Sequence, residues 1–163
     1  LIGLMEQANC VVKQALWSNP FTKGPVQSAG YILNAGSEQF IQDCVHKLQQ
    51  DHAASLLIFP EGTRTAKGEQ LNDFQRGAAN IALRAGVPIR PVLISCTPST
   101  LTKNEKWYHI PEQPFHIHVK VLDAIRVEDV LDDVTVNPKN VRQLNQQLQW
   151  FFNQELSLNE QSC

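Results

Sequence analysis

The pattern of hydrophobic and polar positions along the chain alternates between short apolar runs and longer stripes at helical spacing. The short runs, together with one segment of alternating apolar and polar residues, predict strands at 9–13, 31–33, 55–59, 89–95 and 115–122. Apolar positions with a helical period predict helices at 21–28, 38–50, 73–85 and 138–156. This order predicts an α/β fold, with a mixed, mostly parallel sheet flanked by helices in a single domain.

Residues that begin or end helices support these boundaries. Pro20 opens the first helix and Gly30 ends it, while Ser37 and Asp73 are candidate N-caps of the next two helices. Gly86 is expected to stop the third helix, since a proline follows two residues later. Two stripes are expected to face the core: Phe40, Ile41, Cys44, Val45 and Leu48 in one helix, and Leu144, Leu148, Phe151 and Phe152 in the last.

Composition and charge exclude several classes of protein. The 163 residues have 42% hydrophobic content and a formal net charge of -2, which gives no general attraction to nucleic acid. No apolar run approaches the roughly 20 residues of a membrane-spanning helix. The cysteines (Cys10, Cys44, Cys96 and Cys163) lack metal-type spacing, so buried, reduced thiols in a cytosolic protein are expected.

The segment 59–65, Phe-Pro-Glu-Gly-Thr-Arg-Thr, carries the most chemical information. A buried strand leads directly into it, and in α/β sheets ligands usually bind where strands end. Gly62 lets the backbone approach a ligand closely, and Arg64 offers a charged fork that suits phosphate or carboxylate. The segment therefore predicts an anion-binding loop. The alternative is a tight turn in which a surface Arg64 pairs with Glu61.

The 59–64 signature resembles that of the glycerol-phosphate and lysophosphatidic acid acyltransferase family, and further matches follow the family order. These are Lys13 and Pro20 before the signature, then Phe74, Gly77, Ala82 and the Gly-Val-Pro-Ile-Arg-Pro-Val run 86–92 after it. The resemblance covers about residues 1–95. It implies transfer of a fatty acyl group from acyl-CoA or acyl carrier protein to a hydroxyl of a lipid acceptor, with no other cofactor.

By the same resemblance, Glu61, Gly62, Thr63 and Arg64 bind the polar head of the acceptor. Lys13 and Asn34 are added as candidate substrate-binding residues. Asn34 stands where family members that use glycerol-phosphate acceptors often have an arginine, and an amide cannot neutralise a phosphate. A different hydroxylated or amino-containing lipid acceptor therefore stays open. The resemblance also implies contact with a membrane surface at its cytoplasmic face, either peripherally or through an anchor in the missing N-terminal part.

The family's His-x4-Asp motif, whose His acts as the general base, has no match before Lys13. We expect this motif upstream of Leu1, so that residues 1–163 form the C-terminal part of one acyltransferase domain and are inactive on their own. A non-catalytic lipid- or acyl-chain-binding domain is the alternative. His46 and Asp51 have the same spacing, but on a helix their side chains diverge by about 140°.

Two other groups of residues have a functional and a structural interpretation. His116 and His118 share one face of a predicted strand, and a surface strand is favoured over a metal site because further ligands are lacking. Trp107 and Tyr108 lie in a long polar loop, where they either contact a membrane or acyl channel or pack on the core. No nucleotide-binding glycine motif occurs.

Overall fold

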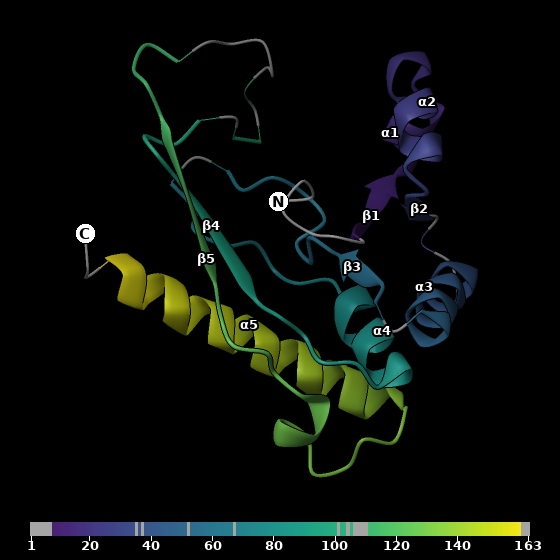
Figure 1. The fold of residues 1–163 in the computed structure, drawn as a ribbon. Helices are drawn as coiled ribbons and strands as arrows, with labels where there is room; N and C mark the ends of the chain where they lie inside the picture. Colours follow the sequence, from purple (N-terminus) through teal and green to yellow (C-terminus); the bar gives the residue numbers. More distant parts are fainter. Residues whose placement is uncertain are drawn as a thin grey trace. The chain divides into compact units, whose positions relative to one another are not determined.

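The computed structural model describes residues 8–34, 36, 38–51, 53–66, 68–100, 102–103, 105 and 111–160. The chain divides into two compact units, which are described separately. The first comprises residues 1–59 and 77–87, and the second comprises residues 60–76 and 88–163. Figure 1 shows their helices and strands.

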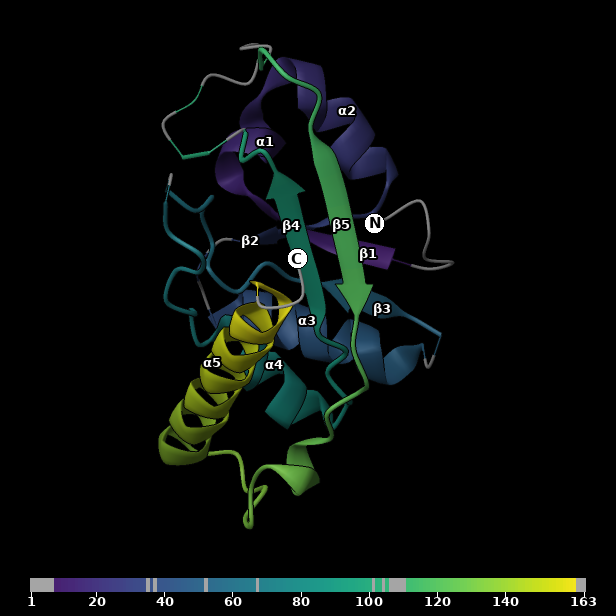
Figure 2. The same ribbon diagram turned by 90° about the vertical axis from the view of Figure 1, so that its left-hand side faces the viewer.

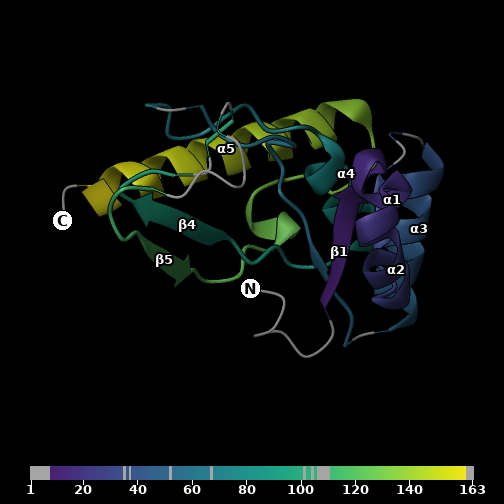
Figure 3. The ribbon, with the colours of Figure 1, turned by 90° about the horizontal axis from the view of Figure 1, so that it is seen from above.

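The first unit is built on a parallel three-stranded sheet in the order β2-β1-β3. The strands are β1 (Ala8–Lys13), β2 (Ile32–Asn34) and β3 (Ser55–Leu57). The helices are α1 (Gln14–Ser18), α2 (Pro20–Ser28), α3 (Glu38–Gln50) and α4 (Gly77–Ala85). Figure 3 shows α1, α2 and α3 beside the central strand β1.

Alternate residues of this sheet enter two different hydrophobic clusters, because successive side chains of a strand point to opposite faces. On one face, Cys10 and Val12 of β1 form a buried cluster with Val26 of α2. On the other face, α3 and α4 supply a second buried cluster, Phe40, Ile41, Cys44 and Ile81, with Val11, Ile32, Val45, Leu48, Leu56 and Ile58 packed against it. Helices therefore cover both faces, and the predicted core stripe of α3 is confirmed.

The second unit combines an antiparallel pair of strands with a long helix. Strand β4 (Val92–Thr97) pairs with β5 (His116–Val121), a 3-10 turn η2 (Val127–Asp129) follows, and α5 (Pro138–Glu160) completes the chain. Lys120 of β5 forms an ion pair with Glu155 of α5 at 3.2 Å, and Figure 2 shows α5 alongside the strands. Within the predicted core stripe of α5, Leu144 and Leu148 are buried.

The opposite face of the β4–β5 pair is apolar and exposed. The pairing register places Val92 opposite Val121, Ile94 opposite Val119, and Cys96 opposite Ile117. Directly opposed residues share a face, so these six side chains form one surface, which we call the apolar strand face. Ile94, Ile117, Val119 and Val121 are between 43% and 60% exposed. No helix among the described residues is both long enough and apolar enough to cross a membrane.

The α/β prediction and most of the predicted elements are confirmed, and several boundaries are corrected. Strand β4 begins at Val92, because Ile89 instead forms an isolated bridge with Ile125. Strand β3 ends at Leu57, two residues before the predicted end. Helix α5 continues to Glu160. The thiol of Cys96 is only partly buried. Ser37, Trp107, Tyr108 and Cys163 lie outside the described residues.

Helix α4 begins at Gly77, four residues after the predicted N-cap Asp73. The backbone N–H groups of Phe74 and Gln75 donate to Gln149 Oε1 and to the Pro60 carbonyl, at 2.6 and 2.8 Å. The segment before the helix is therefore fixed by tertiary hydrogen bonds, which a local capping pattern does not reveal.

Candidate functional site

Two of the six predicted binding residues meet at the carboxyl edge of the parallel sheet. Lys13 is the last residue of β1, Asn34 is the last residue of β2, and they are Cα partners in the pairing register. Asn34 Oδ1 accepts a hydrogen bond from the Gly36 N–H at 3.0 Å. The Asn34 side chain therefore takes part in a local turn at the position where parallel strands usually meet ligands.

The other four, Glu61 to Arg64, form the turn that follows β3 through Ile58 and Phe59. They belong to the second unit, whereas Lys13 and Asn34 belong to the first. The turn is fixed at its start, because the Pro60 carbonyl accepts from the Gln75 N–H at 2.8 Å. Gly62 has φ +64°, a left-handed conformation that other residues rarely adopt. The signature therefore forms a turn in which the glycine adopts a positive φ.

Replacing Gly62 by alanine is expected to lower the free energy of unfolding by about 1 kcal/mol, through the left-handed backbone alone. An added Cβ would have Gln75 Cγ as its nearest neighbour at 3.7 Å, which is ordinary van der Waals contact. Urea denaturation measures the change. Gly77→Ala is the control, because Gly77 opens α4 with open space around it and no positive φ, and there alanine should be neutral or stabilising. Equal effects of the two variants would contradict this account.

The guanidinium of Arg64 contacts a segment distant in sequence. Its Nη1 donates to the Glu105 carbonyl at 3.4 Å and its Nη2 donates to the Lys103 carbonyl at 3.3 Å. The Lys103 N–H in turn donates to the Thr65 carbonyl at 3.1 Å. Arg64 is exposed, so its charge is fixed at the surface of the turn by main-chain oxygens rather than buried. This geometry ties the permanent positive charge of the turn to the main chain at residues 103 and 105.

Glu61 is half-buried, and this burial raises the pKa of its carboxyl above the ordinary value of 4.5. A backbone hydrogen bond at Glu61 opposes the effect and is the smaller of the two. The folded protein therefore disfavours the charged carboxylate relative to the unfolded chain. The carboxyl of Glu61 holds its proton to higher pH than an ordinary glutamate.

This shift predicts how Glu61→Gln changes stability with pH. Below pH 4.5 the carboxyl is largely protonated in both states, so the burial penalty on its charge is absent. As the pH rises through the folded pKa, wild type acquires that penalty and the glutamine variant does not. The variant should therefore gain stability relative to wild type between pH 4 and pH 7, as measured by urea denaturation. A difference that is constant with pH, or that has the opposite sign, would contradict the assignment.

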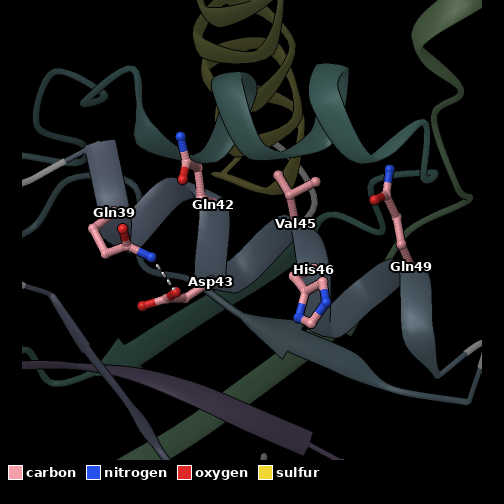
Figure 4. A pocket seen from close by; sticks show the side chains of 6 residues that line it. All are labelled: Gln39, Gln42, Asp43, Val45, His46 and Gln49. Atoms are coloured by element: carbon pink, nitrogen blue, oxygen red, sulfur yellow. Dashed lines mark hydrogen bonds between the residues drawn. The ribbon is translucent and has the colours of Figure 1, made fainter.

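His46 and Asp51, which have His-x4-Asp spacing, each make local contacts instead of a pair. His46 Nε2 lies 3.0 Å from Gln50 Nε2, and Asp51 Oδ1 accepts from the Ala53 N–H at 3.0 Å. Figure 4 shows His46 on the exposed side of α3, in a shallow depression that also contains the hydrogen bond from Gln39 to Asp43 at 2.8 Å. The expectation that these two residues belong to a solvated helix end agrees with this geometry.

The part of the chain that the structure describes contains no group of three His, Cys, Asp or Glu side chains that could hold a metal ion. His116 and His118 are exposed on β5, opposite Thr97 and Ser95. This arrangement is that of a surface strand.

Sequence reasoning missed two groups of residues near the 61–64 turn. One is the main chain at Lys103 and Glu105, which carries no side-chain signal for binding Arg64. The other is Asn145 and Gln149 of α5, which hydrogen-bond the main chain of residues 72–74. Their spacing of four residues, next to the core positions Leu144 and Leu148, was the available signal.

The sequence pattern of the Acyltransferase family matches residues 5–95, more than half of the chain. The chain belongs to the acyltransferase family. The matched region contains the whole first unit that the structure describes and the 59–64 signature. It ends before β5 and α5, so Asn145 and Gln149 lie outside the family pattern.

Curated relatives of this chain agree with the family match. The chain is 36% identical over 86 residues to 1-acyl-sn-glycerol-3-phosphate acyltransferase alpha of Mus musculus. The aligned region covers 52% of this chain and 29% of the mouse protein. It is 46% identical over 50 residues to 1-acyl-sn-glycerol-3-phosphate acyltransferase of Escherichia coli, covering 31% of this chain and 20% of that protein. The chain thus spans less than a third of the length of either relative.

A solved structure shows a similar fold. It is the crystal structure of the 1-acyl-sn-glycerophosphate acyltransferase PlsC from Thermotoga maritima, with a TM-score of 0.65 and 19% sequence identity. The similarity covers 92% of this chain and 57% of that chain. The fold likeness therefore extends past residue 95, beyond the region that the family pattern matches.

Proposed function

We propose that the protein transfers a fatty acyl group from a thioester, acyl-CoA or acyl carrier protein, to a hydroxyl of a lysophospholipid-like acceptor. The observation that carries this proposal is the 59–64 signature turn, which lies within a region matched to the acyltransferase family. In the turn, the left-handed Gly62 leaves the backbone accessible and Arg64 supplies a fixed positive charge. These features suit the anionic head of a lipid acceptor.

The reaction needs a base, a nucleophile and a leaving group, and it involves no redox step. A base removes the proton of the acceptor hydroxyl, the oxygen attacks the thioester carbonyl carbon, the C–S bond breaks, and the thiolate leaves and takes up a proton. The ester forms as the thioester is consumed. The identity of the base is still the prediction made from the resemblance: a His of a His-x4-Asp motif upstream of Leu1. The described His46 and Asp51 are engaged elsewhere.

An acyl-transfer assay tests this proposal. Acyl-CoA and acyl carrier protein thioesters are offered with lysophosphatidic acid, glycerol 3-phosphate and monoacylglycerol, and both the ester product and the released thiol are measured. Transfer is expected with the protein that carries its native upstream sequence, and loss of transfer is expected when the upstream His is replaced. Absence of thiol release with every acceptor would refute the proposed acyl-transfer activity. Acceptor binding without thiol release would favour the non-catalytic lipid-binding domain.

We also propose that the protein associates peripherally with a membrane surface, at its cytoplasmic face. The apolar strand face of β4 and β5 supports this, since exposed apolar surface of this kind is typical of interaction sites. Replacing Ile117 and Val119 together by serine is expected to lower the bound fraction in co-sedimentation with phosphatidylcholine vesicles by at least threefold. Serines at Val134 and Val136, exposed residues outside the strands, are the control. Equal binding of both variants would contradict a role for this face.

A further inference from the structure

Two amide side chains of α5 bind the main chain of the segment 72–74. Gln149 Oε1 accepts from the Phe74 N–H at 2.6 Å, and Gln149 Nε2 donates to the Asn72 carbonyl at 3.4 Å. One helical turn earlier, Asn145 Nδ2 donates to the Phe74 carbonyl at 3.1 Å. Residues four apart lie on the same face of a helix, so both amides hydrogen-bond the same stretch of main chain. We call this arrangement the amide clamp.

The amide clamp is partly buried and is supported by packing. The side chain of Phe74 is 8% exposed, and its ring makes an edge-to-face contact with Phe152 at a centroid distance of 5.2 Å. Main-chain groups in such a place need partners, since a buried polar group without a hydrogen bond is destabilising. Asn145 and Gln149 supply partners for both the N–H and the carbonyl of Phe74. The position of this residue is thereby fixed from two sides.

The clamped segment continues directly into the contact that holds the signature turn. The Gln75 N–H donates to the Pro60 carbonyl at 2.8 Å, immediately before Glu61. The Gln75 side chain also lies next to Gly62. Its Cγ is 3.7 Å from the position that a Cβ on Gly62 would occupy. All of these residues belong to the second unit. An unbroken series of contacts therefore runs from α5, through residues 74 and 75, to the start of the turn.

We propose that Gln149, assisted by Asn145, is a positioning residue that fixes the signature turn for acceptor binding. This inference rests on the proposed function, because it assumes that the turn holds the acceptor head. Gln149 binds the main chain of Phe74 and Asn72 and acts on the turn through Phe74 and Gln75. Loss of the amide clamp should leave the turn less ordered before the acceptor binds. Binding must then order the turn, and the conformational entropy lost in doing so weakens acceptor binding. The acceptor KM should therefore rise while kcat changes little.

Three variants test the amide clamp. Gln149→Met keeps the length of the side chain and removes both hydrogen bonds, whereas Gln149→Glu keeps an oxygen that can accept from the Phe74 N–H. Gln147→Met, at an exposed position of the same helix, is the control. Amide hydrogen exchange at Phe74 and Gln75 is measured together with KM and kcat for the acceptor.

In Gln149→Met, exchange at Phe74 and Gln75 is expected to accelerate at least tenfold, and the acceptor KM to rise about tenfold, with kcat and donor KM within twofold of wild type. Gln149→Glu should restore protection from exchange at Phe74, and its acceptor KM should lie close to the wild-type value. Gln147→Met should match wild type in both measurements. Faster exchange with an unchanged acceptor KM would reduce the clamp to a structural role and overturn the inference.

Failure of the proposed function would look different. If wild type, assayed with its native upstream sequence, transfers no acyl group to any acceptor, the proposed function is wrong, and the amide clamp is judged by hydrogen exchange alone. In that case unchanged exchange at Gln75 in Gln149→Met overturns the clamp, and faster exchange supports it as the element that fixes the turn.

Discussion

Phe40→Ala is expected to lower the free energy of unfolding by about 3–5 kcal/mol, the range for removing a buried aromatic side chain. Phe40 is 7% exposed and belongs to the cluster that α3 and α4 form with Ile41, Cys44 and Ile81 on one face of the parallel sheet. Removing the ring takes away its burial and leaves a cavity among these side chains. Urea denaturation followed by far-ultraviolet circular dichroism measures the loss.

Phe21→Ala is the matched control, because Phe21 lies in the same unit but is 90% exposed. Its free energy of unfolding should stay within about 0.5 kcal/mol of wild type. A loss of this size in Phe40→Ala can prevent folding altogether, so Phe40→Leu, with an expected loss of about 1–2 kcal/mol, gives a measurable intermediate. Equal losses at positions 21 and 40 would show that this cluster does not hold the unit together.

The hydrophobic pattern predicted β1, β2, α2 and α3 of the first unit, because there the local signal and the tertiary role coincide, whereas the short helix α1 was not predicted. In α3, the residues at helical spacing are the same residues that pack against β1 and β3. Glycines with positive φ mark the ends of α2 and α4, as expected from Gly30 and Gly86. In such places a window of a few residues contains all the information that decides the structure.

The predictions failed where partners distant in sequence decide the local structure. Asp73 resembles an N-cap, yet Phe74 and Gln75 donate to Gln149 and Pro60, so the helix begins at Gly77. Single-sequence patterns do not reveal a partner that lies 75 residues away. The same limit applies to Arg64, whose contacts to the carbonyls of residues 103 and 105 span 39 and 41 positions.

For the candidate site, the sequence predicted the turn but not what supports it. The signature was visible because its residue types combine an acid, a glycine and an arginine directly after a strand. Its supports are main-chain atoms and two amides of α5, and such groups resemble ordinary surface residues in a sequence. The pairing of Lys13 with Asn34 became apparent only when the parallel register was known.

Arg64→Ala is expected to lower kcat/KM for an anionic acceptor such as lysophosphatidic acid by about 30- to 150-fold, which corresponds to about 2–3 kcal/mol for one charged hydrogen bond. The guanidinium is held by two main-chain carbonyls, so its charge does not have to be ordered when the acceptor binds. Arg64→Lys keeps the positive charge but lacks the planar guanidinium, which can donate two parallel hydrogen bonds. Its kcat/KM should therefore lie between those of Arg64→Ala and wild type. Arg142→Ala, at an exposed position of α5, is the control and should match wild type.

Two interpretations of Arg64 predict different substrate dependence. If its charge binds the acceptor, the loss in Arg64→Ala should be large for lysophosphatidic acid and small for the uncharged monoacylglycerol. If Arg64 only ties the turn to residues 103 and 105, both acceptors should lose the same factor, since either one needs the same turn. The ratio of the two kcat/KM values therefore separates charge recognition from loop support. A ratio that stays at the wild-type value in Arg64→Ala would remove the anion-binding role from this residue.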